Sequence, residues 1–398
     1  MAEVDTVTSV PVAIVGAGPA GLMLAHRLGR AGIEAVNIDI RTRHEIETTH
    51  RAGILEAGAA MDLVETGVGD RVLRDGYEHE GVELRFGGQG HRIDFQKLVG
   101  ASVWLYPQTD VFIDLADARA RDGGTVHFGV TDPSVEDVTT SAPVVRFTAA
   151  DGTRHEVRPR IVVGADGSRS MCRQLVPEQA RTQFFREYPF AWFGILCEAP
   201  MAAPELIYAH SDHGFALISQ RTDAIQRMYF QCDPEEDVDA WSQEAIWETL
   251  QARVAGTDSF RLTEGPIFEK TVLRFRSFVQ QPMRWGNLVL AGDAAHTVPP
   301  TGARGLNLAL HDVKVLAGVL EKALGSGGEA ALDEYEPAAL QRVWRAQNFS
   351  YWMTQMLHTA PGSTPFDLRR QMGELDNIVG TEAGRRYLAE QYTGWPNG

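Results

Sequence analysis

The sequence predicts an α/β protein in which a Rossmann-like dinucleotide-binding fold is interleaved with an antiparallel sheet and followed by a helical C-terminal region. Three observations lead to this fold class. A glycine-rich motif follows an apolar run near the N-terminus, short runs alternate apolar and polar residues between 188 and 233, and apolar residues recur at helical spacing from 305 to 324. Alternation is typical of half-buried strands, and repeats of three and four residues are typical of helices.

The first glycine motif has the pattern of a phosphate-binding turn. It follows the apolar run 10–15 and reads Gly16-Ala17-Gly18-Pro19-Ala20-Gly21. In such turns the first glycine makes the tight bend, the second lets a pyrophosphate approach the backbone, and the third lets the next helix pack on the strand. The helix N-terminus then offers free N–H groups to the phosphates.

Asp39 is the acidic partner that this motif requires. It ends the second apolar run, about 20 residues after the glycines, where a carboxylate accepts hydrogen bonds from a ribose. A glycine-rich turn that binds no ligand is the plain alternative. Because the strand, the helix and Asp39 occur together, the sequence favours dinucleotide binding.

Two later motifs extend the predicted cofactor site. Gly164-Ala165-Asp166-Gly167 follows one strand-like run, and Ala291-Gly292-Asp293-Ala294-Ala295-His296 follows another. A loop over 298–305 then leads into the predicted helix. In this order the three motifs indicate a flavin dinucleotide held along its whole length.

Composition argues against several other classes of protein. The 398 residues carry a formal charge of −16 without a basic cluster, which argues against nucleic acid or an anionic membrane as a partner. No apolar run approaches the length of a membrane span, and the acidic residues 1–5 do not resemble a secretory signal. The three cysteines are widely spaced and lack a CxxC motif, which predicts a cytoplasmic protein with no structural metal.

The predicted domains are interleaved along the chain. A FAD-binding domain covers 1–180, with part of the substrate domain inserted near 75–105, and it continues over 276–325. The antiparallel sheet of the substrate domain covers 181–275, and the helical C-terminal region covers 326–398.

One strand of the predicted sheet carries a polar pair on an apolar face. In the run 215–221, alternation places Leu217, Ser219 and Arg221 on the same side. A hydroxyl and a guanidinium there are costly unless they meet a partner, and the planar carboxylate of a ligand suits both. Tyr229, on the next strand, adds a third donor. An arginine paired with a local carboxylate at the sheet edge explains the pattern equally well.

Taken together, the motifs resemble those of the single-component flavoprotein aromatic hydroxylases. The similarity runs nearly end to end, from Pro11 to Pro396. The resemblance implies a glutathione-reductase-like FAD-binding fold, a tightly but non-covalently bound FAD, and a homodimer. Besides the glycine motifs, it rests on Arg51-Ala52-Gly53-Ile54-Leu55-Glu56, Glu205-Leu206-Ile207-Tyr208, Gly214-Phe215-Ala216-Leu217, Arg276-Ser277-Phe278 and Glu390-Gln391-Tyr392.

The resemblance also implies a reaction. The expected substrate is a small aromatic acid, 4-hydroxybenzoate, which is hydroxylated at C3 to 3,4-dihydroxybenzoate (protocatechuate) through a flavin C4a-hydroperoxide. Oxygen is the oxidant, and NADH or NADPH is a transient co-substrate. Ser219, Arg221 and Tyr229 are then assigned to the substrate carboxylate.

A proton path is implied at the other end of the pocket. By resemblance, Tyr208 bonds the substrate 4-hydroxyl, Tyr392 bonds Tyr208, and the path ends at His79 near solvent. Tyrosine suits such a path because its hydroxyl both donates and accepts, and histidine titrates near neutral pH. Pro300 presents its carbonyl to the substrate phenol, and Arg227 holds the flavin in its closed position.

The resemblance assigns further residues to the cofactor. Asp293 accepts from ribityl hydroxyls, and Asn307 lies near the ring system. Arg51 and Gln108 contact the pyrophosphate and the ribityl chain, and the helix dipole beyond residue 305 stabilises negative charge on the reduced ring. The complete set is Gly16, Gly18, Ala20, Gly21, Asp39, Arg51, Gln108, Asp166, Asp293, Gly305, Leu306 and Asn307.

The electron donor is predicted from the charges beyond the second strand. No second glycine motif followed by an acid is present, so the reductant is expected to bind transiently on the FAD domain. Members of the family that demand NADPH carry arginines at the positions of Ile40 and Thr49. Glu45 and Glu47 disfavour binding of the 2′-phosphate of NADPH. Arg41 and Arg43 are able to bind it. The balance predicts efficient use of NADH, with NADPH equal or worse.

Three questions stay open from the sequence. One alternative is the same chemistry on 4-aminobenzoate or 3,4-dihydroxybenzoate, and another is a flavin reductase or sensor that never oxygenates a substrate. Tyr208, Tyr392 and Arg221 oppose the second alternative. The aromatic helix 343–356 is either a dimer surface or part of the core. The first alternative calls for polar replacements in the ring pocket, which is predicted to consist of Ile54, Trp192, Leu206, Leu217 and Ala303.

Overall fold

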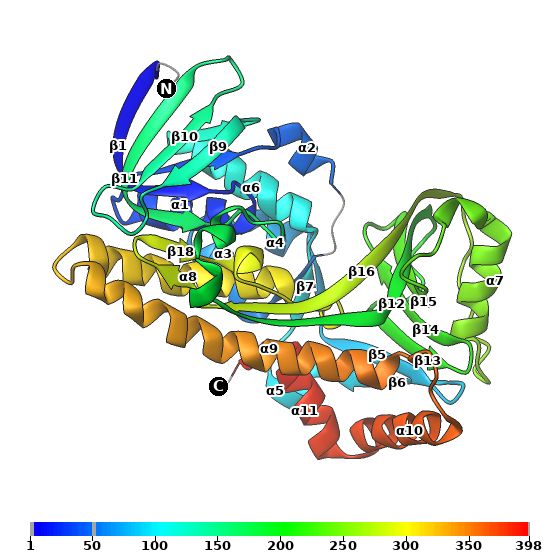
Figure 1. The fold of residues 1–398 in the computed structure, drawn as a ribbon. Helices are drawn as coiled ribbons and strands as arrows, with labels where there is room; N and C mark the ends of the chain where they lie inside the picture. Colours follow the sequence, from blue (N-terminus) through cyan, green and yellow to red (C-terminus); the bar gives the residue numbers. More distant parts are fainter. Residues whose placement is uncertain (1–3, 50–52, 397–398) are drawn as a thin grey trace.

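A computed structural model of the protein describes residues 4–49 and 53–396. One sheet forms the upper left lobe of Figure 1, with strand order β17-β18-β11-β1-β2-β8 and a parallel centre. Its central strands are apolar because both faces of a parallel sheet are covered. The strands are β1 (Thr6–Val15), β2 (Ala35–Asp39), β8 (Val126–Phe128), β9 (Thr131–Glu136), β10 (Val144–Thr148), β11 (Arg154–Gly164), β17 (Arg284–Trp285) and β18 (Leu288–Leu290).

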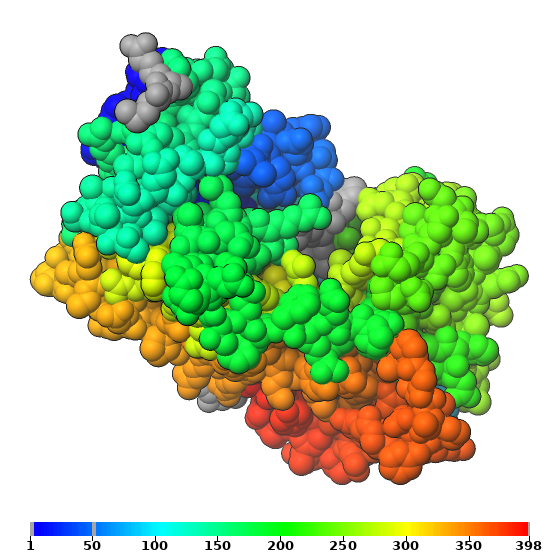
Figure 2. Space-filling model, in the orientation of Figure 1, coloured from blue at the N-terminus to red at the C-terminus, as the bar shows by residue number. Residues whose placement is uncertain are grey.

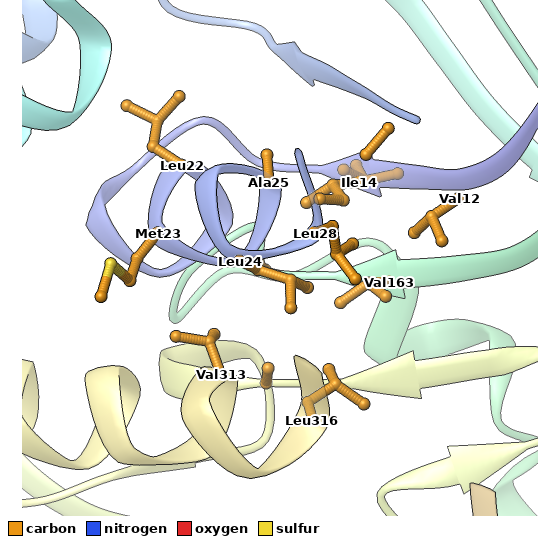
Figure 3. Close-up of a cluster of buried hydrophobic side chains, with 14 of the residues drawn as sticks. Val12, Ile14, Leu22, Met23, Leu24, Ala25, Leu28, Val163, Val313 and Leu316 are labelled. Carbon is orange, nitrogen blue, oxygen red and sulfur yellow. The ribbon is translucent and has the colours of Figure 1, made fainter. Parts of the chain in front are cut away.

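Helices α1 (Pro19–Arg30), α6 (Gln108–Arg121) and α8 (Gly305–Leu324) surround this sheet. Figure 3 shows α1 between the sheet and α8, with Leu24 and Leu28 facing Val313 and Leu316. All four side chains are buried, and full burial of one such side chain stabilises the fold by about 2 kcal/mol. The packing of α1 between the sheet and α8 therefore fixes the position of the glycine turn at the start of α1.

The second sheet has the order β19-β16-β12-β15-β14-β13-β5-β6, and its pairs are antiparallel apart from β13 with β5. Two of its strands come from the predicted insertion near 75–105. The fold class predicted from the sequence is confirmed. The strands are β5 (Gly81–Phe86), β6 (Gln89–Asp94), β12 (Thr182–Glu198), β13 (Ile207–Ser211), β14 (Gly214–Gln220), β15 (Ile225–Cys232), β16 (Ile267–Gln281) and β19 (His296–Thr297).

β12 and β16 are far longer than the runs that predicted the sheet. They pair with each other along most of their length and join the two lobes (Figure 1). The predicted boundary between residues 275 and 276 falls inside β16, so the chain passes between the lobes without a linker there. The domain boundaries themselves stay a prediction.

A small third sheet and the C-terminal helices complete the fold. The sheet consists of β3 (Ile54–Glu56), β7 (Val103–Leu105) and β4 (Tyr77–His79). Figure 2 shows the orange and red C-terminal segments along the lower edge of both lobes. No helix within residues 4–49 and 53–396 combines the length and the apolar character needed to cross a membrane. The other helices are α2 (Arg43–Glu47), α3 (Ala57–Glu65), α4 (Asp70–Asp75), α5 (Phe95–Val99), α7 (Gln243–Val254), α9 (Tyr335–Leu357), α10 (Pro365–Gly380) and α11 (Glu382–Tyr392).

Candidate active site

The first glycine motif forms an open cradle at the N-terminus of α1. Gly16 has φ of +114°, and a Cβ on it would lie 2.1 Å from the carbonyl oxygen of Ala165 in the second motif. A Cβ on Gly21 would lie 2.0 Å from the Gly16 carbonyl oxygen. A Cβ on Gly18, by contrast, would have no atom of the described residues within 4 Å, and none of their side chains caps the helix there. The turn therefore leaves both space and backbone donors for a pyrophosphate, which fits FAD.

Asp39 lies at the end of β2 beside this cradle. Its carboxylate accepts hydrogen bonds from the backbone N–H of Ala17 and of Arg41, each at 2.9 Å. The side chain is buried and holds the turn after β1 against the end of β2. A carboxylate has four acceptor positions, so two remain for a ribose.

Asp166 in the second motif is directed at its own loop. Its carboxylate accepts from Ser170 Oγ at 2.6 Å and from the backbone N–H of Met171 and Cys172 at 2.8 and 3.1 Å. These bonds shape the turn after β11. In this structure Asp166 positions the loop, and its predicted contact with a cofactor stays a prediction.

The third motif is fixed to α8 by a buried ion pair that was not predicted from the sequence. Asp312 accepts from the backbone N–H of Gly292 at 2.8 Å and contacts His296 Nε2 at 2.6 Å. Burial opposes a charge on His296, but the Asp312 carboxylate outweighs it and raises the pKa of the imidazole. Asp293 is half-buried, and its carbonyl oxygen accepts from Arg173 Nη1 at 3.4 Å.

Asn307 is held by three hydrogen bonds within the protein, and its predicted position near the flavin ring stays a prediction. Its Oδ1 accepts from the backbone N–H of Glu56 at 2.9 Å, and its Nδ2 donates to the carbonyls of Ile54 and Ala303 at 2.8 and 2.9 Å. Three of its four hydrogen-bond positions are therefore occupied, and the side chain ties β3 to the loop before α8. Only an acceptor position remains for a cofactor.

The other predicted cofactor residues lie at the starts of two helices. Gly305 and Leu306 begin α8, and in the part of the chain that the structure describes no side chain caps this helix and no atom would lie within 4 Å of a Cβ on Gly305. Gln108 begins α6, and a Cβ on Gly53 would lie 2.7 Å from its backbone nitrogen. Arg51 lies outside the described residues.

The predicted substrate face is an aromatic cluster on the second sheet. Leu217 of β14 lies in register with Tyr208 of β13 and with Tyr229 of β15. All three are buried in one cluster with Trp192, whose indole N–H donates to His358 Nε2 at 2.6 Å. The indole is thereby held in place without leaving a free donor in the cluster.

The polar end of this face carries two arginines. Ser219 Oγ donates to the carbonyl of Arg227 at 2.8 Å, and the Arg227 guanidinium lies 5.5 Å from the centre of the Tyr229 ring. Arg221 directly follows β14, and its Nη2 donates to Thr109 Oγ1 at 3.3 Å. Burial, reinforced by Arg227, lowers the pKa of Arg221.

Arg221 lacks the local carboxylate that was the alternative explanation of its position. Among the described residues, no Asp or Glu oxygen lies within 4.0 Å of its guanidinium nitrogens. A half-buried guanidinium that donates only to one hydroxyl keeps donors and a positive charge available for an anionic partner. The structure thus supports an anionic ligand at Arg221.

Tyr208 and Tyr392 form the hydroxyl pair that the resemblance implies. Their oxygens are 2.8 Å apart, and both side chains are buried. Burial raises the pKa of Tyr208, while the hydrogen bonds from Tyr392 and the Gly302 backbone act in the opposite direction. Burial and the neighbouring Tyr208 raise the pKa of Tyr392 well above its usual value. A negative charge is therefore better tolerated on the Tyr208 side.

The expectation that His79 lies near solvent is wrong. The side chain is fully buried in β4, and its Nε2 accepts from Gln220 Nε2 at 2.9 Å. Burial lowers the pKa of His79 to about 4, so the imidazole is neutral at pH 7. No hydrogen bond joins it to Tyr392 within residues 4–49 and 53–396. The misassignment arose because burial of a three-residue strand depends on the sheets packed around it.

Pro300 lies in a tight loop before α8. Its carbonyl accepts from the Ala303 N–H at 2.9 Å, and a second lone pair remains for a ligand. Ala303 adopts φ of +53°, which is costly for a residue with a side chain. The following Arg304 is buried and ion-paired with Glu56, a contact that the motif did not reveal.

Comparison with known proteins agrees with this geometry. The FAD binding domain family matches residues 9–350. The chain is 41% identical over 386 residues to the p-hydroxybenzoate hydroxylase of Acinetobacter baylyi, covering 97% of this chain and 95% of that protein. It is 28% identical to a 3-(3-hydroxy-phenyl)propionate/3-hydroxycinnamic acid hydroxylase of Mycolicibacterium gilvum, covering 83% of this chain and 57% of that protein.

Solved structures share the fold at low sequence identity. The p-nitrophenol 4-monooxygenase of Pseudomonas putida matches with a TM-score of 0.81 and 19% identity over 97% of this chain and 99% of that one. Aklavinone-11 hydroxylase matches with a TM-score of 0.72 and 20% identity over 92% and 73%. With the matched domain and the close relative, these findings confirm that the chain belongs to the single-component FAD-dependent aromatic hydroxylases, flavoproteins that hydroxylate aromatic compounds with O2.

Proposed function

We propose that the protein hydroxylates 4-hydroxybenzoate at C3 to give 3,4-dihydroxybenzoate. One observation carries this: a single apolar face has an unpaired guanidinium at one end and a buried hydroxyl pair at the other. Tyr208 of β13 lies opposite Leu217 of β14. Leu217 precedes Arg221, which directly follows β14, by four residues. At about 3.3 Å per residue the two backbone positions are about 13 Å apart, which leaves room between the side chains for one para-substituted ring.

The carboxylate end is proposed to bind Ser219, Arg221 and Tyr229. Arg221 supplies the positive charge, and the absence of a counterion among the described residues means that substrate binding breaks no existing ion pair. Ser219 now donates to the Arg227 carbonyl, so its hydroxyl must rotate to donate to a carboxylate. Tyr229, held beside Arg227, adds a neutral donor.

The phenol end is proposed to bind Tyr208 and the carbonyl of Pro300. A free phenol has a pKa of about 10 and is mostly protonated at pH 7, although the ring is far more reactive as a phenolate. Tyr208 stabilises the phenolate by donating to it and passes the proton towards Tyr392. Bound FAD, once reduced by the nicotinamide, would supply the electrons that activate O2, and O2 would be the source of the oxygen atom added to the ring.

The cofactor is proposed to bind tightly and non-covalently across the three glycine motifs. Gly16, Gly18, Ala20 and Gly21 form the pyrophosphate cradle, and Asp39 accepts from the ribose. Asp293 and Gln108 are proposed to contact the ribityl chain, and Gly305 and Leu306, which begin α8, are proposed to offer the N-terminus of that helix to the ring. Arg227 is proposed to steady the ring, and Arg51 stays assigned by resemblance alone.

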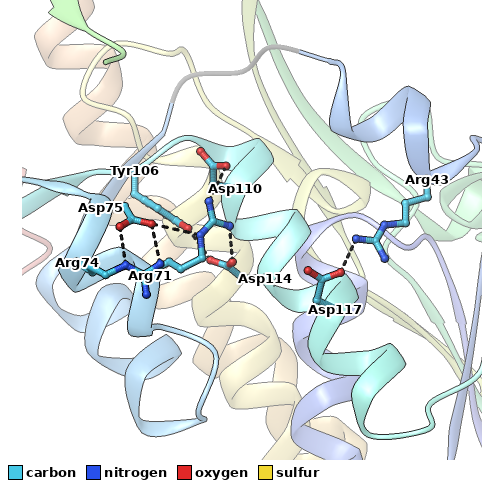
Figure 4. Close-up of polar contacts among 8 residues, drawn as sticks. All are labelled: Arg43, Arg71, Arg74, Asp75, Tyr106, Asp110, Asp114 and Asp117. Carbon is cyan, nitrogen blue, oxygen red and sulfur yellow. Dashed lines mark hydrogen bonds and ion pairs between the residues drawn. The ribbon is translucent and has the colours of Figure 1, made fainter. Parts of the chain in front are cut away.

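NADH is proposed as the electron donor. Arg43, a candidate for a 2′-phosphate, is ion-paired with Glu47 and Asp117, as Figure 4 shows for Asp117. Arg41 lies 3.6 Å from Asp39, so both arginines already face carboxylates. Steady-state kcat/KM for the two donors, at saturating 4-hydroxybenzoate, tests this assignment. A preference for NADPH of tenfold or more, about 1.4 kcal/mol, would contradict it.

A cytoplasmic homodimer is proposed from the exposed aromatic residues and the unpaired cysteines. On α9, Phe349 is fully buried, whereas Trp344 is 42% exposed and packs edge-on against the exposed Phe184 of β12. The helix therefore contributes to the core on one face and offers an aromatic surface on the other. Light scattering of the wild type and of Trp344→Glu tests whether this surface holds a dimer.

One assay separates the proposed reaction from its alternatives. The holoenzyme is incubated with NADH, O2 and either 4-hydroxybenzoate, 4-aminobenzoate or 3,4-dihydroxybenzoate, and hydroxylated product is quantified against hydrogen peroxide. Product close to one equivalent per NADH with 4-hydroxybenzoate alone supports the proposal. Peroxide with every acid indicates a reductase, and product with another acid indicates a different substrate.

A further inference from the structure

A hollow of about 210 Å³ opens between the two lobes, next to the candidate substrate face. Its walls come from α4, β4, the start of α6 and the turn after β14. The residues that matter are Arg71, Asp75, Tyr77, Leu105, Asp110 and Arg221.

The hollow and the substrate face share side chains. Leu105 belongs to the buried cluster that contains Tyr208 and Tyr229, Tyr77 packs against that cluster, and both also line the hollow. Arg221 ends the polar side of the substrate face and lines the hollow as well. The hollow and the substrate face therefore meet at Arg221, Leu105 and Tyr77.

Charge within the hollow favours one landing point for an anion. Arg71 is ion-paired with Asp114 at 2.7 Å, Asp110 at 3.3 Å and Asp75 at 3.4 Å, as Figure 4 shows. Its charge is fully compensated. Arg221, by contrast, has no carboxylate within 4.0 Å in the part of the chain that the structure describes. An incoming carboxylate is attracted to Arg221 rather than to Arg71.

We propose that this hollow is the access site for the aromatic acid. The carboxylate first meets Arg221 from the solvent side, with the ring against Tyr77 and Leu105. The acid then passes this boundary to the substrate face while the carboxylate keeps its contact with Arg221. This inference rests on the proposed function, because it takes Arg221 as the carboxylate ligand.

Blocking the mouth of the hollow tests the proposal. Asp75 is exposed at the C-terminal end of α4, so Asp75→Trp adds bulk there without entering the core. Stopped-flow spectra of the flavin in the holoenzyme give the association and dissociation rates of 4-hydroxybenzoate. We expect both rates to fall at least fivefold while Kd stays within twofold, because an obstacle on the path slows both directions equally. Asp75→Asn removes the same charge but leaves the hollow open, so its rates should stay within twofold of the wild type.

A second variant tests the proposal independently, in case Asp75→Trp does not fold. Tyr77→Ala widens the mouth, and both rates should rise together by at least twofold. Unchanged rates in Asp75→Trp and Tyr77→Ala would overturn the proposal, since the acid would then use another route. A higher Kd with an unchanged association rate would also overturn it, because the hollow would be part of the final binding site. If the wild type does not bind 4-hydroxybenzoate, the proposed substrate fails, and the same rates for a benzoate that does bind test the hollow separately.

Discussion

The two sides of the candidate active site differ in what shapes them: backbone geometry shapes the FAD side, and buried side chains shape the substrate side. On the FAD side the geometry comes from backbone, because Gly16 and Gly21 are packed so closely that a Cβ would collide with a neighbouring carbonyl. On the substrate side it comes from buried side chains, including Tyr208, Tyr392 and His79, whose pKa values are shifted by burial. Substitutions on the FAD side should therefore act through shape, and those on the substrate side through charge and proton position.

The largest effect is expected in the glycine cradle, where two matched alanines separate shape from folding. Gly18→Ala fills space that none of the described residues occupies, so the apo-protein should keep its Tm while its Kd for FAD rises about 100-fold, or about 3 kcal/mol. Gly21→Ala collides with the Gly16 carbonyl, so both Tm and FAD affinity should fall. Thermal melting and titration of FAD fluorescence check both. Equal FAD affinity in Gly18→Ala and the wild type would show that the cradle does not hold the phosphates.

The next largest effect is expected at the charged end of the substrate face. Arg221→Ala removes the only unpaired guanidinium described there and should raise the KM for 4-hydroxybenzoate at least 30-fold, about 2 kcal/mol. Stimulation of flavin reduction by the substrate should weaken in parallel. Steady-state and anaerobic reduction kinetics measure both, with Ser219→Ala as the milder control. Unchanged substrate affinity in Arg221→Ala would remove Arg221 from the site.

At the end of the substrate face that carries Tyr208, a substitution should change the coupling of NADH consumption to hydroxylation rather than the affinity for substrate. Tyr208→Phe keeps the ring but loses the hydroxyl bonded to Tyr392, so Kd for 4-hydroxybenzoate should change little. Hydroxylation slows when the phenolate is no longer stabilised, so roughly a tenth or less of the NADH should yield product and the rest peroxide. The amounts of hydroxylated product and of hydrogen peroxide formed per NADH consumed test this prediction. Full coupling in Tyr208→Phe would mean that the tyrosine only packs.

The smallest effect is expected in the pH dependence of stability. The pKa of His79 is about 4 in the folded protein and about 6.5 when unfolded, so between these values the unfolded state binds more protons. The free energy of unfolding should therefore decrease as the pH is lowered through that window. Between pH 7.5 and 5.5 the wild type should lose about 1 kcal/mol more than His79→Gln, measured by urea unfolding. Identical pH profiles would show that His79 is charged or exposed in solution.

The same contrast explains how much could be predicted from the sequence. The glycine turns and the shared face of Leu217 and Ser219 on β14 were predictable because they depend on residues close together in the chain or on strict alternation. His79, Asn307 and Asp312 were not, because their surroundings come from segments far away: Gln220 bonds His79, Glu56 bonds Asn307, and Gly292 bonds Asp312. β16 also went unpredicted, since much of it is polar and exposed and draws its order from β12.

The long pairing of β12 with β16 has a consequence for the evolution of this chain. β5 and β6 leave the first lobe to join the second sheet, β12 carries the chain out again, and β16 brings it back. No single stretch of the gene therefore encodes the substrate sheet alone. Recombination that exchanged such a stretch would cut strands that depend on partners elsewhere. New substrates should arise in this architecture by point substitutions within the sheet rather than by exchange of modules.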